Sequence, residues 1–395
     1  MDFRLSEEQQ MLKDSVQRFL EKNYSFEQRR KLIAERQGMS PQVWAGFASL
    51  GLLGVPFSTE HGGFGGNGVD VMIVMEALGR ALSIEPYLAT VLLAGGAIDR
   101  GGAPWQKNIL LPKIIDGSMI LTFAHSEPSA RYDLNHVETR AVQDGQGWTL
   151  NGRKSIVLHG AVAEKYLVSA RTSGSTRDAH GVTLFLVEAD EEGIGGRDYP
   201  MFDGTRAGEL TLSDVRVGAE SIIGTLDKAL PLIEQVTDRA IAALCAEAVG
   251  AMEALHSTTL EYLKARQQFG VPIGKFQALQ HRMVDMLIYL EQARSLALLA
   301  AVKCWSDDAH ERRHACAAAK EYVGRAGRFI GQQAIQLHGG MGMTDELPAS
   351  HYFKRLTAID MLLGDQAHHR ARFAQMKESE PAEKLEKPRK AWKQI

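Results

Sequence analysis

Residues 266–277 read RQQFGVPIGKFQ, a short break between two long helical stretches. The Gly-Val-Pro-Ile-Gly turn interrupts the backbone, and Arg266 and Gln268 place a cation and an amide beside it. A second break, QLHGG at 336–340, ends in two glycines that permit close approach of a ligand. Arginine can bind a phosphate through two hydrogen bonds. These residues alone fit a phosphate-bearing cofactor along a bundle and plain helix-helix turns equally well.

Long helical patterns lie on both sides of these breaks. Apolar residues recur at helical spacing over segments 231–266, 276–307, 310–337 and 349–376. Long antiparallel helices joined by short turns are typical of a bundle. We therefore expect a C-terminal four-helix bundle over 228–376, followed by a charged, mobile tail at 377–395.

The first half of the chain contains two regions with different patterns of hydrophobic and turn residues. Residues 1–120 carry helical patterns that begin with SEEQQMLKDSVQRFLEKNY, where Ser6 is a candidate N-cap. Residues 121–227 change to short runs rich in Val, Thr, Leu and Phe, and QDGQG between two such runs indicates a hairpin. The chain is therefore predicted to be α+β and mainly α, with a helical N-terminal domain, a central antiparallel β-domain and the bundle.

Composition narrows the class of protein. The 395 residues are 45% hydrophobic, which is enough for two or three domains. A net charge of −3 without a basic cluster argues against nucleic-acid binding. The N-terminus is charged from its second residue and no run of about 18 uncharged apolar residues occurs, so we expect neither a signal peptide nor a membrane span. Cys245, Cys304 and Cys316 are expected to be reduced core thiols of a cytoplasmic protein.

Two patterns suggest sites that we do not expect. GFGGNG at 63–68 matches a dinucleotide fingerprint, but it lies between helical segments rather than inside a strand-helix-strand unit, so we interpret it as a loop. The histidines at 310 and 314, and those at 368 and 369, lack a completing carboxylate or cysteine. We expect them on solvated helix surface and predict no metal site.

One carboxylate stands out in the stretch AALCAEAVGA at 242–251. Glu247 is surrounded by small and apolar residues, and its neighbours one helical turn away cannot pair with a charge; they are Ala243, Leu244, Gly250 and Ala251. Either this face opens onto chemistry that needs a carboxylate, or a cation from elsewhere, such as Arg239 or Lys320, neutralises it.

Four segments taken together resemble a known family. They are FAHSEPSARYD (123–133), NGRKSIVLHG with KYLVSART (151–172), RQQFGVPIGKFQALQHRMVDM (266–286) and QLHGGMGM (336–343). Their order and spacing resemble the acyl-CoA dehydrogenase family, and the resemblance extends from residue 5 to about 376. Three stretches are most similar to the small subunit of the bacterial pimeloyl-CoA dehydrogenase group; they are ALCAEAVGAMEALH, HYFKRLTAID and FAHSEPSARYD.

The resemblance implies FAD, shared between neighbouring subunits, and α,β-desaturation of an acyl-CoA thioester with a flavoprotein as electron acceptor. It places the flavin ring against one set of residues, which comprises Phe123, His125, Ser126, Ile156, Val157 and Leu158. It places the rest of the cofactor against a neighbour's Arg266, Gln268, Phe269, Gln277, Gln336, Leu337, His338, Gly339 and Gly340. A hetero-tetramer with a second dehydrogenase-like subunit, or a homo-oligomer, is implied.

The sequence departs from the family pattern where the catalytic base is expected. One family position for the base falls on Leu363, within the stretch 362–365, and the other falls on Ala240. Glu247 is the carboxylate that remains on the expected helix face, so we predict it as the base; burial of a carboxyl group favours proton uptake. The hydroxyl often found near the flavin is replaced by Leu158. The alternative is a partner subunit that has lost part of its own site.

The acyl group is the least determined feature. A dicarboxylyl-CoA such as pimeloyl-CoA needs a cation at the far end of its chain, and Arg131 stands where the family usually has glycine. We name Arg131 and Arg239 as candidate substrate residues. A surface arginine without such a role is the alternative for Arg131.

Overall fold

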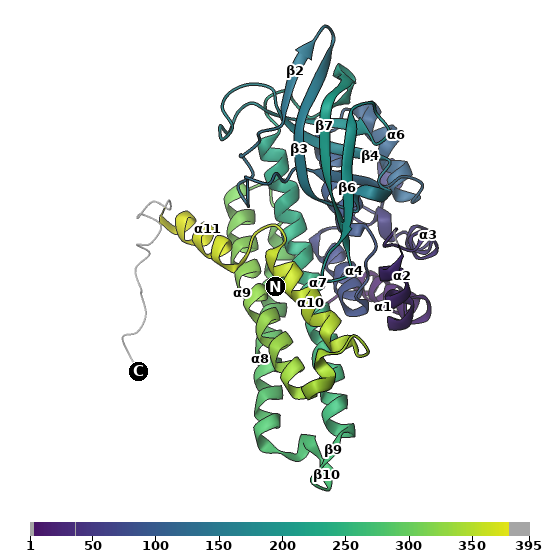
Figure 1. Cartoon of the computed structure of the whole chain (residues 1–395), viewed down its shortest axis with the longest axis vertical. Helices are drawn as coiled ribbons and strands as arrows, with labels where there is room; N and C mark the ends of the chain where they lie inside the picture. Colours follow the sequence, from purple (N-terminus) through teal and green to yellow (C-terminus); the bar gives the residue numbers. More distant parts are fainter. Residues whose placement is uncertain (1–3, 36, 379–395) are drawn as a thin grey trace.

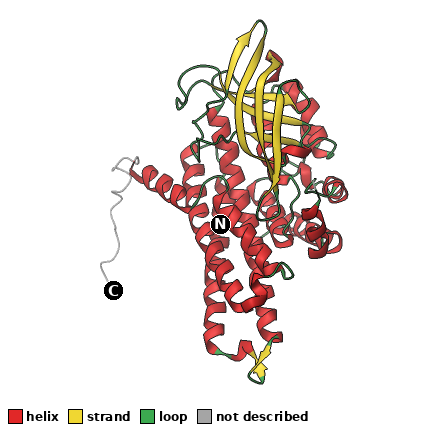
Figure 2. Cartoon of the chain, viewed as in Figure 1, coloured by secondary structure: helices red, strands yellow, loops and turns green. Residues whose placement is uncertain are grey.

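The computed structural model describes residues 4–35 and 37–378. A β-sheet occupies one end of the molecule, short helices pack beside it, and long helices run away from it to the opposite end (Figures 1 and 2). This arrangement confirms the predicted fold class. The domain boundaries at 120, 227 and 376 stay a prediction, and the predicted tail lies outside the described residues from position 379 onward.

The N-terminal part is helical. Ser6 accepts a hydrogen bond from the backbone of Gln9, whose side chain accepts in return from the Ser6 backbone, so a capping box begins the first helix. The GFGGNG stretch leads into a helix capped by Asn67 and follows no strand. The elements are α1 (Glu7–Asn23), α2 (Phe26–Ala34), α3 (Pro41–Ser49), η1 (Leu52–Gly54), η2 (Thr59–His61), α4 (Gly68–Ala81), the π-helical η3 (Tyr87–Gly95), α5 (Gly96–Gly101) and α6 (Pro104–Ile115).

The central sheet follows the order β6-β7-β3-β2-β4-β5-β8, with β1 paired to β4. The hairpin predicted at QDGQG joins β2 and β3. The sheet is mixed rather than antiparallel throughout, because β1 and β2 both run parallel to β4. Alternation of side chains reveals a strand but not its direction. The strands are β1 (Leu121–Ala124), β2 (Arg140–Asp144), β3 (Gly147–Leu158), β4 (Lys165–Arg171), β5 (Val182–Glu188), β6 (Ile194–Pro200), β7 (Arg206–Gly218) and β8 (Ile222–Ile223), with η4 (Gly160–Val162) and η5 (Ala219–Ser221) between them.

The bundle has one more helix than predicted. The segment expected as one helix over 349–376 is two helices, because Leu363 and Gly364 have φ values of 56° and 109° and end the first of them. A glycine tolerates such a conformation. The elements are α7 (Leu230–Ala265), β9 (Gln267–Gln268), β10 (Val271–Pro272), η6 (Ile273–Lys275), α8 (Gln277–Lys303), α9 (Ala309–His338), η7 (Gly339–Met343), α10 (Pro348–Met361) and α11 (Gln366–Glu378).

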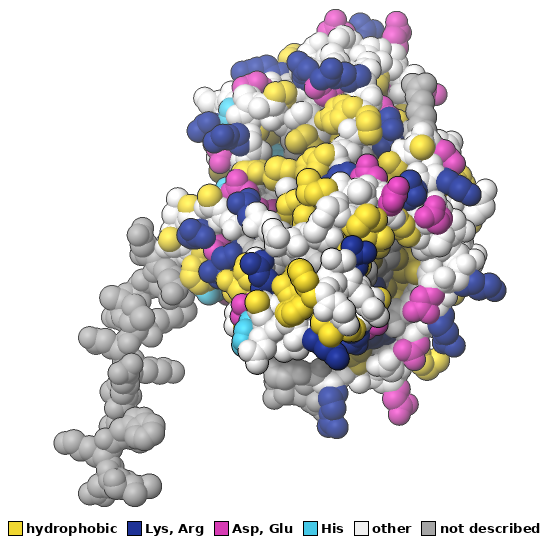
Figure 3. All heavy atoms as spheres, turned by 60° about the horizontal axis from the view of Figure 1, so that its bottom comes forward, with side chains coloured by type: hydrophobic (Ala, Val, Ile, Leu, Met, Phe, Trp, Pro, Cys, Tyr) yellow, Lys and Arg dark blue, Asp and Glu magenta, His cyan; other side chains and the backbone are white. Residues whose placement is uncertain are grey.

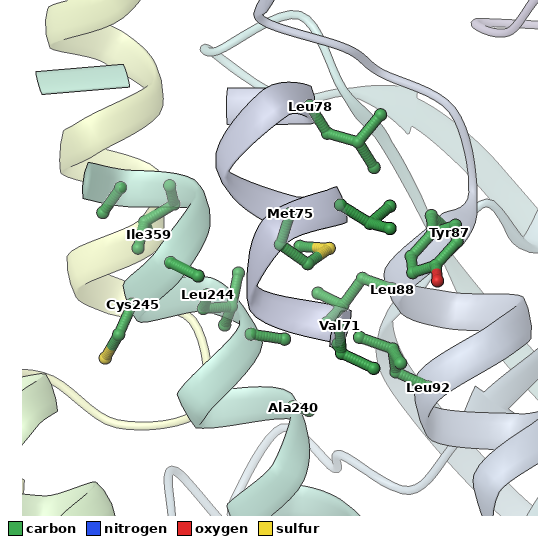
Figure 4. Close-up of a cluster of buried hydrophobic side chains, with 14 of the residues drawn as sticks. Val71, Met75, Leu78, Tyr87, Leu88, Leu92, Ala240, Leu244, Cys245 and Ile359 are labelled. Atoms are coloured by element: carbon green, nitrogen blue, oxygen red, sulfur yellow. The ribbon is translucent and has the colours of Figure 1, made fainter. Parts of the chain in front are cut away.

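Helices α4 and α7 pack backbone against backbone at two glycines. A Cβ on Gly79 would lie 1.9 Å from the carbonyl oxygen of Glu247, and one on Gly250 would lie 1.9 Å from that of Glu76. Apolar side chains of α4, η3, α7 and α10 fill the adjoining core (Figure 4). By length and composition α7 could cross a membrane, yet 83% of its most apolar window is buried inside the fold, as in a core helix.

The cysteines and histidines complete the comparison with the sequence. Cys245, Cys304 and Cys316 are free and buried, as predicted. The expectation of solvated histidines is wrong for His369, which is fully buried and hydrogen-bonded to the carbonyl of Leu363 at 3.0 Å. The break between α10 and α11 brings that carbonyl to the imidazole. Among the described residues, no group of His, Cys, Asp or Glu is arranged to hold a metal ion.

Candidate functional site

The two unusual breaks meet at one end of the bundle. The Tyr262 ring of α7 stacks on the His338 ring of α9 with centroids 4.4 Å apart, and the Tyr262 hydroxyl donates to the His338 carbonyl at 3.3 Å. Leu337 and His338 are buried there. The other predicted residues of this end are exposed, and 89% of Phe269 is accessible; they are Arg266, Gln268, Phe269, Gln277, Gln336, Gly339 and Gly340.

The predicted flavin residues lie at the sheet end of the molecule: Phe123 on β1, His125 and Ser126 directly after β1, and residues 156–158 on β3. Phe123 stacks on His125 with ring centroids 5.7 Å apart. Ile156 has a φ of 52° and is half-exposed, Val157 is buried in the sheet core, and Leu158 is partly buried. The Leu158 carbonyl accepts from the Thr122 hydroxyl of β1, which ties the ends of the two strands together.

The two predicted sets do not meet within one chain. The β9–β10 turn, with the bundle-end residues, stands at the opposite end of the long helices from β1 and β3 (Figure 1). A single ligand that uses both sets must therefore bridge two chains.

Glu247 has a cationic partner, but that partner is neither Arg239 nor Lys320. Arg355 of α10 holds both of its oxygens, with Nε at 2.5 Å and Nη2 at 2.8 Å. Arg239 instead lies over the ring of Trp305, 4.2 Å from its centroid. Lys320 donates to the carbonyls of Asp360 and Gly364. The expectation that either of these cations neutralises Glu247 is therefore wrong.

The Glu247–Arg355 pair belongs to a larger buried cluster. Nη1 of Arg355 donates to Oδ2 of Asp203 at 2.8 Å, and Arg29 donates to the Asp203 carbonyl at 2.7 Å. All four side chains are more than nine-tenths buried. Burial lowers the pKa of Arg355, but the charges of Glu247 and Asp203 outweigh burial and raise it. Two cations and two carboxylates thus balance inside the core.

A small, partly open cavity of about 30 Å³ adjoins this cluster. Its walls include Glu247 and Arg355, together with Leu158 and Leu362, so it joins the strand that carries the predicted flavin residues to the position next to the expected base. Ligand pockets of enzymes are about 300–1,000 Å³. The cavity has room for one or two water molecules rather than an acyl chain.

Two polar groups of this cavity were missed at the sequence level. Glu85 is 7% exposed and receives a hydrogen bond from the Ser40 backbone, and burial raises the pKa of its carboxyl group to about 8. His159 has its Nε2 next to the Ile84 carbonyl, and Nδ1 is without a partner. The left-handed φ of 54° at His159 gave no signal in the sequence. Glu85 follows the helix α4, where a run of apolar residues indicated burial.

The candidate substrate residues do not line this cavity. Arg131 lies exposed on the segment after β1, with a φ of 50°, and no carboxylate of the described residues pairs with it. Arg239 is buried against Trp305, and burial lowers its pKa to about 10. The structure thus leaves Arg131 accessible to an anion and places Arg239 in packing.

Three sequence profiles match this chain. They describe the N-terminal, middle and C-terminal domains of acyl-CoA dehydrogenases and match residues 6–118, 122–215 and 232–376. The chain belongs to the acyl-CoA dehydrogenase family. It is therefore a flavoprotein oxidoreductase of acyl-CoA oxidation, with FAD as cofactor and a flavoprotein as electron acceptor.

Relatives support this assignment over most of the chain. YngJ of Bacillus subtilis, a probable acyl-CoA dehydrogenase, is 30% identical over 354 residues, which are 88% of this chain and 91% of that protein. The caffeyl-CoA reductase-Etf complex subunit CarC of Acetobacterium woodii is 28% identical, over 88% of this chain and 92% of its own. The structure is also similar to a chain of the ChsE4-ChsE5 complex from Mycobacterium tuberculosis, with a TM-score of 0.87 and 27% identity over 97% of this chain and all of that one.

The residues of this acyl-CoA dehydrogenase fit FAD at both ends. A Cβ on Gly339 or Gly340 would meet nothing within 4 Å, so the backbone there is open to a ligand. Arg266 and Gln268 supply a cation and an amide to the same surface. On the flavin side the chain offers the exposed Ile156 beside His125 and Ser126, and Leu158 contributes no hydroxyl.

Proposed function

We propose that this chain is one subunit of a hetero-oligomeric, cytoplasmic acyl-CoA dehydrogenase that introduces an α,β double bond into an acyl-CoA thioester. Its bundle end would complete the FAD site of a neighbouring subunit. The observation that carries the proposal is the placement of the two FAD-binding sets at opposite ends of the chain. When bound, FAD accepts the hydride that leaves the β-carbon.

An exposed apolar surface supports assembly. The bundle helix α8 exposes Val284, Leu287 and Ile288 at helical spacing, each more than two-fifths accessible. The face turned toward the bundle end shows hydrophobic side chains gathered among charged ones (Figure 3). Apolar patches on a soluble protein mark interaction sites. The similar structure from Mycobacterium tuberculosis is that of the ChsE4-ChsE5 complex, which is consistent with a second, different subunit here.

The residues at the expected base positions support a dependent rather than a self-sufficient subunit. The base positions hold Leu363 and Ala240, and Glu247 is bound at both oxygens by Arg355. Both oxygens of Glu247 are thus engaged by the guanidinium of Arg355 rather than open to a substrate. A base from the partner subunit's own active site would then perform the chemistry in the assembled enzyme.

A second candidate function keeps Glu247 as the base of this chain. It is favoured by one observation: Glu247 lines the same cavity as Leu158 and Leu362. Proton abstraction by Glu247 would require Arg355 to release it and the cavity to enlarge around the thioester. Backbone or side-chain donors to the thioester oxygen would acidify the α-proton.

Expression alone and with a second dehydrogenase-like subunit separates the two functions. We expect this chain alone to give no flavin bleaching with acyl-CoA under anaerobic conditions, and the co-purified complex to bleach at a rate that Glu247→Gln leaves unchanged. Glu253→Gln, an ion-paired carboxylate further along α7, is the matched control. Bleaching by the isolated chain that is lost in Glu247→Gln and retained in Glu253→Gln would establish the second function instead.

Under the second function, in which this chain's own site acts, the substrate is proposed to be a dicarboxylyl-CoA such as pimeloyl-CoA, recognised through Arg131. Support comes from the exposed, unpaired guanidinium of Arg131 on the segment after β1. We expect Arg131→Ala to lower kcat/KM for pimeloyl-CoA by roughly tenfold or more, since hydrogen bonds to charged groups contribute about 1.5–3 kcal/mol, and to spare octanoyl-CoA. Steady-state kinetics of the complex with both substrates test this. Equal losses would show that Arg131 binds the CoA moiety common to both.

A further inference from the structure

A buried lysine lies inside the β-domain, where an ammonium group is costly. Lys154 of β3 is fully buried, and its Nζ lies 2.6 Å from Oε1 of Glu127, 3.0 Å from the Ser169 hydroxyl and 3.4 Å from the His125 carbonyl. An ammonium group has three protons to donate and no acceptor. Each proton therefore has one acceptor, and Glu127 balances the charge.

The lysine determines the direction of the next hydrogen bond. Ser169 accepts from Lys154, and its remaining close contact is with Nδ1 of His125 at 2.9 Å. If Nδ1 carried a proton and donated it to Ser169, the buried hydroxyl proton would have no acceptor, which is unfavourable. The serine therefore donates to Nδ1, and Nδ1 carries no proton.

The proton of the neutral ring lies on the other ring nitrogen. Because Nδ1 accepts from Ser169, the N–H of His125 is at Nε2. Burial lowers the pKa of His125 to about 3, so the ring is neutral at physiological pH.

The same network holds the rest of the segment between β1 and β2. Glu127 accepts from the backbone amides of Glu138 at 2.6 Å and Thr139 at 3.0 Å. The segment between these anchors carries Tyr132, whose ring packs against His368 of α11 at 5.2 Å. The segment thus reaches from the sheet to the bundle. On the sheet side it is held by Glu127, which is also the partner of Lys154.

We propose that Lys154 and Ser169 are positioning residues that hold the single proton of His125 on Nε2, at the end of β1 where segment 126–139 begins. The proposal rests on the proposed function only in placing the flavin beside β1 and β3. The hydrogen-bonded chain itself is a property of these side chains. Neither Lys154 nor Ser169 needs to touch the cofactor.

Nitrogen NMR of the imidazole shows directly which ring nitrogen of His125 carries the proton. In the full-length chain, co-purified with its partner and labelled with ¹⁵N-histidine, the His125 signals are assigned by subtracting the spectrum of His125→Gln from those of the 13 histidines. We expect a pyrrole-type shift at Nε2 and a pyridine-type shift at Nδ1. The matched pair Ser169→Thr and Ser169→Val differs only in the hydroxyl. Thr should keep the wild-type signals, and Val should shift both toward averaged values.

Two outcomes would overturn the proposed positioning of the His125 proton. They are a protonated Nδ1 in the wild type, or identical His125 signals in the Thr and Val variants. If neither Ser169 variant folds, the double variant Lys154→Met with Glu127→Gln replaces them. It removes both charges together and should also abolish the preference of the proton for Nε2. FAD content, measured on the same samples, is a separate readout. Absence of FAD from the wild-type complex would contradict the proposed function, but it would not change the result for the His125 proton.

Discussion

Replacement of Arg355 by methionine is expected to lower the free energy of unfolding by about 3–5 kcal/mol. Methionine keeps most of the side-chain volume but leaves Glu247 and Asp203 as buried carboxylates without the guanidinium that contacts both. Breaking a buried pair from one side is costly because the remaining charge stays desolvated. Urea unfolding at a fixed protein concentration, followed by circular dichroism, measures the loss.

A matched control and a rescue accompany this prediction. Lys354→Met changes the neighbouring residue, whose ion pair with Asp345 is largely exposed, and should cost less than about 1 kcal/mol. Arg355→Met combined with Glu247→Met removes the unpaired charge and should recover part of the loss. Wild-type stability for Arg355→Met alone would show that water or another cation replaces the guanidinium.

The second prediction concerns pH. Burial raises the pKa of Glu85 from 4.5 to about 8, so the folded protein keeps a proton there that the unfolded chain releases above pH 4.5. Stability from this group is fully present below pH 4.5 and is lost as pH rises toward 8. The expected loss is on the order of 4 kcal/mol. Glu85→Gln should remove this dependence and be more stable than the wild type at pH 8.

The difference between the two proteins isolates Glu85 from the other titrating groups. Denaturant midpoints at half-unit intervals from pH 4.5 to 8.5 provide the profile, and Glu60→Gln, an exposed carboxylate of the same part of the chain, is the control. Parallel profiles for wild type and Glu85→Gln would contradict the assignment of a retained proton to this carboxyl group.

The sequence predicted the fold because helical period, strand alternation and turn residues are local signals. It missed the ion pair of Glu247 because pairing is a property of packing. The clue was nevertheless present: Arg355 lies between Tyr352 and Ile359 on the buried face of its helix, as Glu247 does on α7. Two opposite charges on the buried faces of neighbouring helices predict one another, but the sequence does not reveal which helices touch.

The break at 362–365 was missed for a related reason. Leu362 and Leu363 continue the helical pattern, and only Gly364 opposes it. In the structure the left-handed conformations of Leu363 and Gly364 free the Leu363 carbonyl for His369 and the Gly364 carbonyl for Lys320. A lysine and a histidine from other turns thus stabilise a break that propensity alone does not require.

The glycine contacts between α4 and α7 determine how this molecule can move. With Gly79 against the Glu247 carbonyl and Gly250 against the Glu76 carbonyl, the two helices interlock and behave as one rigid body. Sliding or separating them would cost close contacts along both backbones. Any enlargement of the cavity at Glu247 therefore falls to its other walls, which include η3 at Tyr87 and Leu88, Arg355 of α10, and the loops at His159 and Leu362. The wall formed by α4 and α7 stays fixed while these elements move.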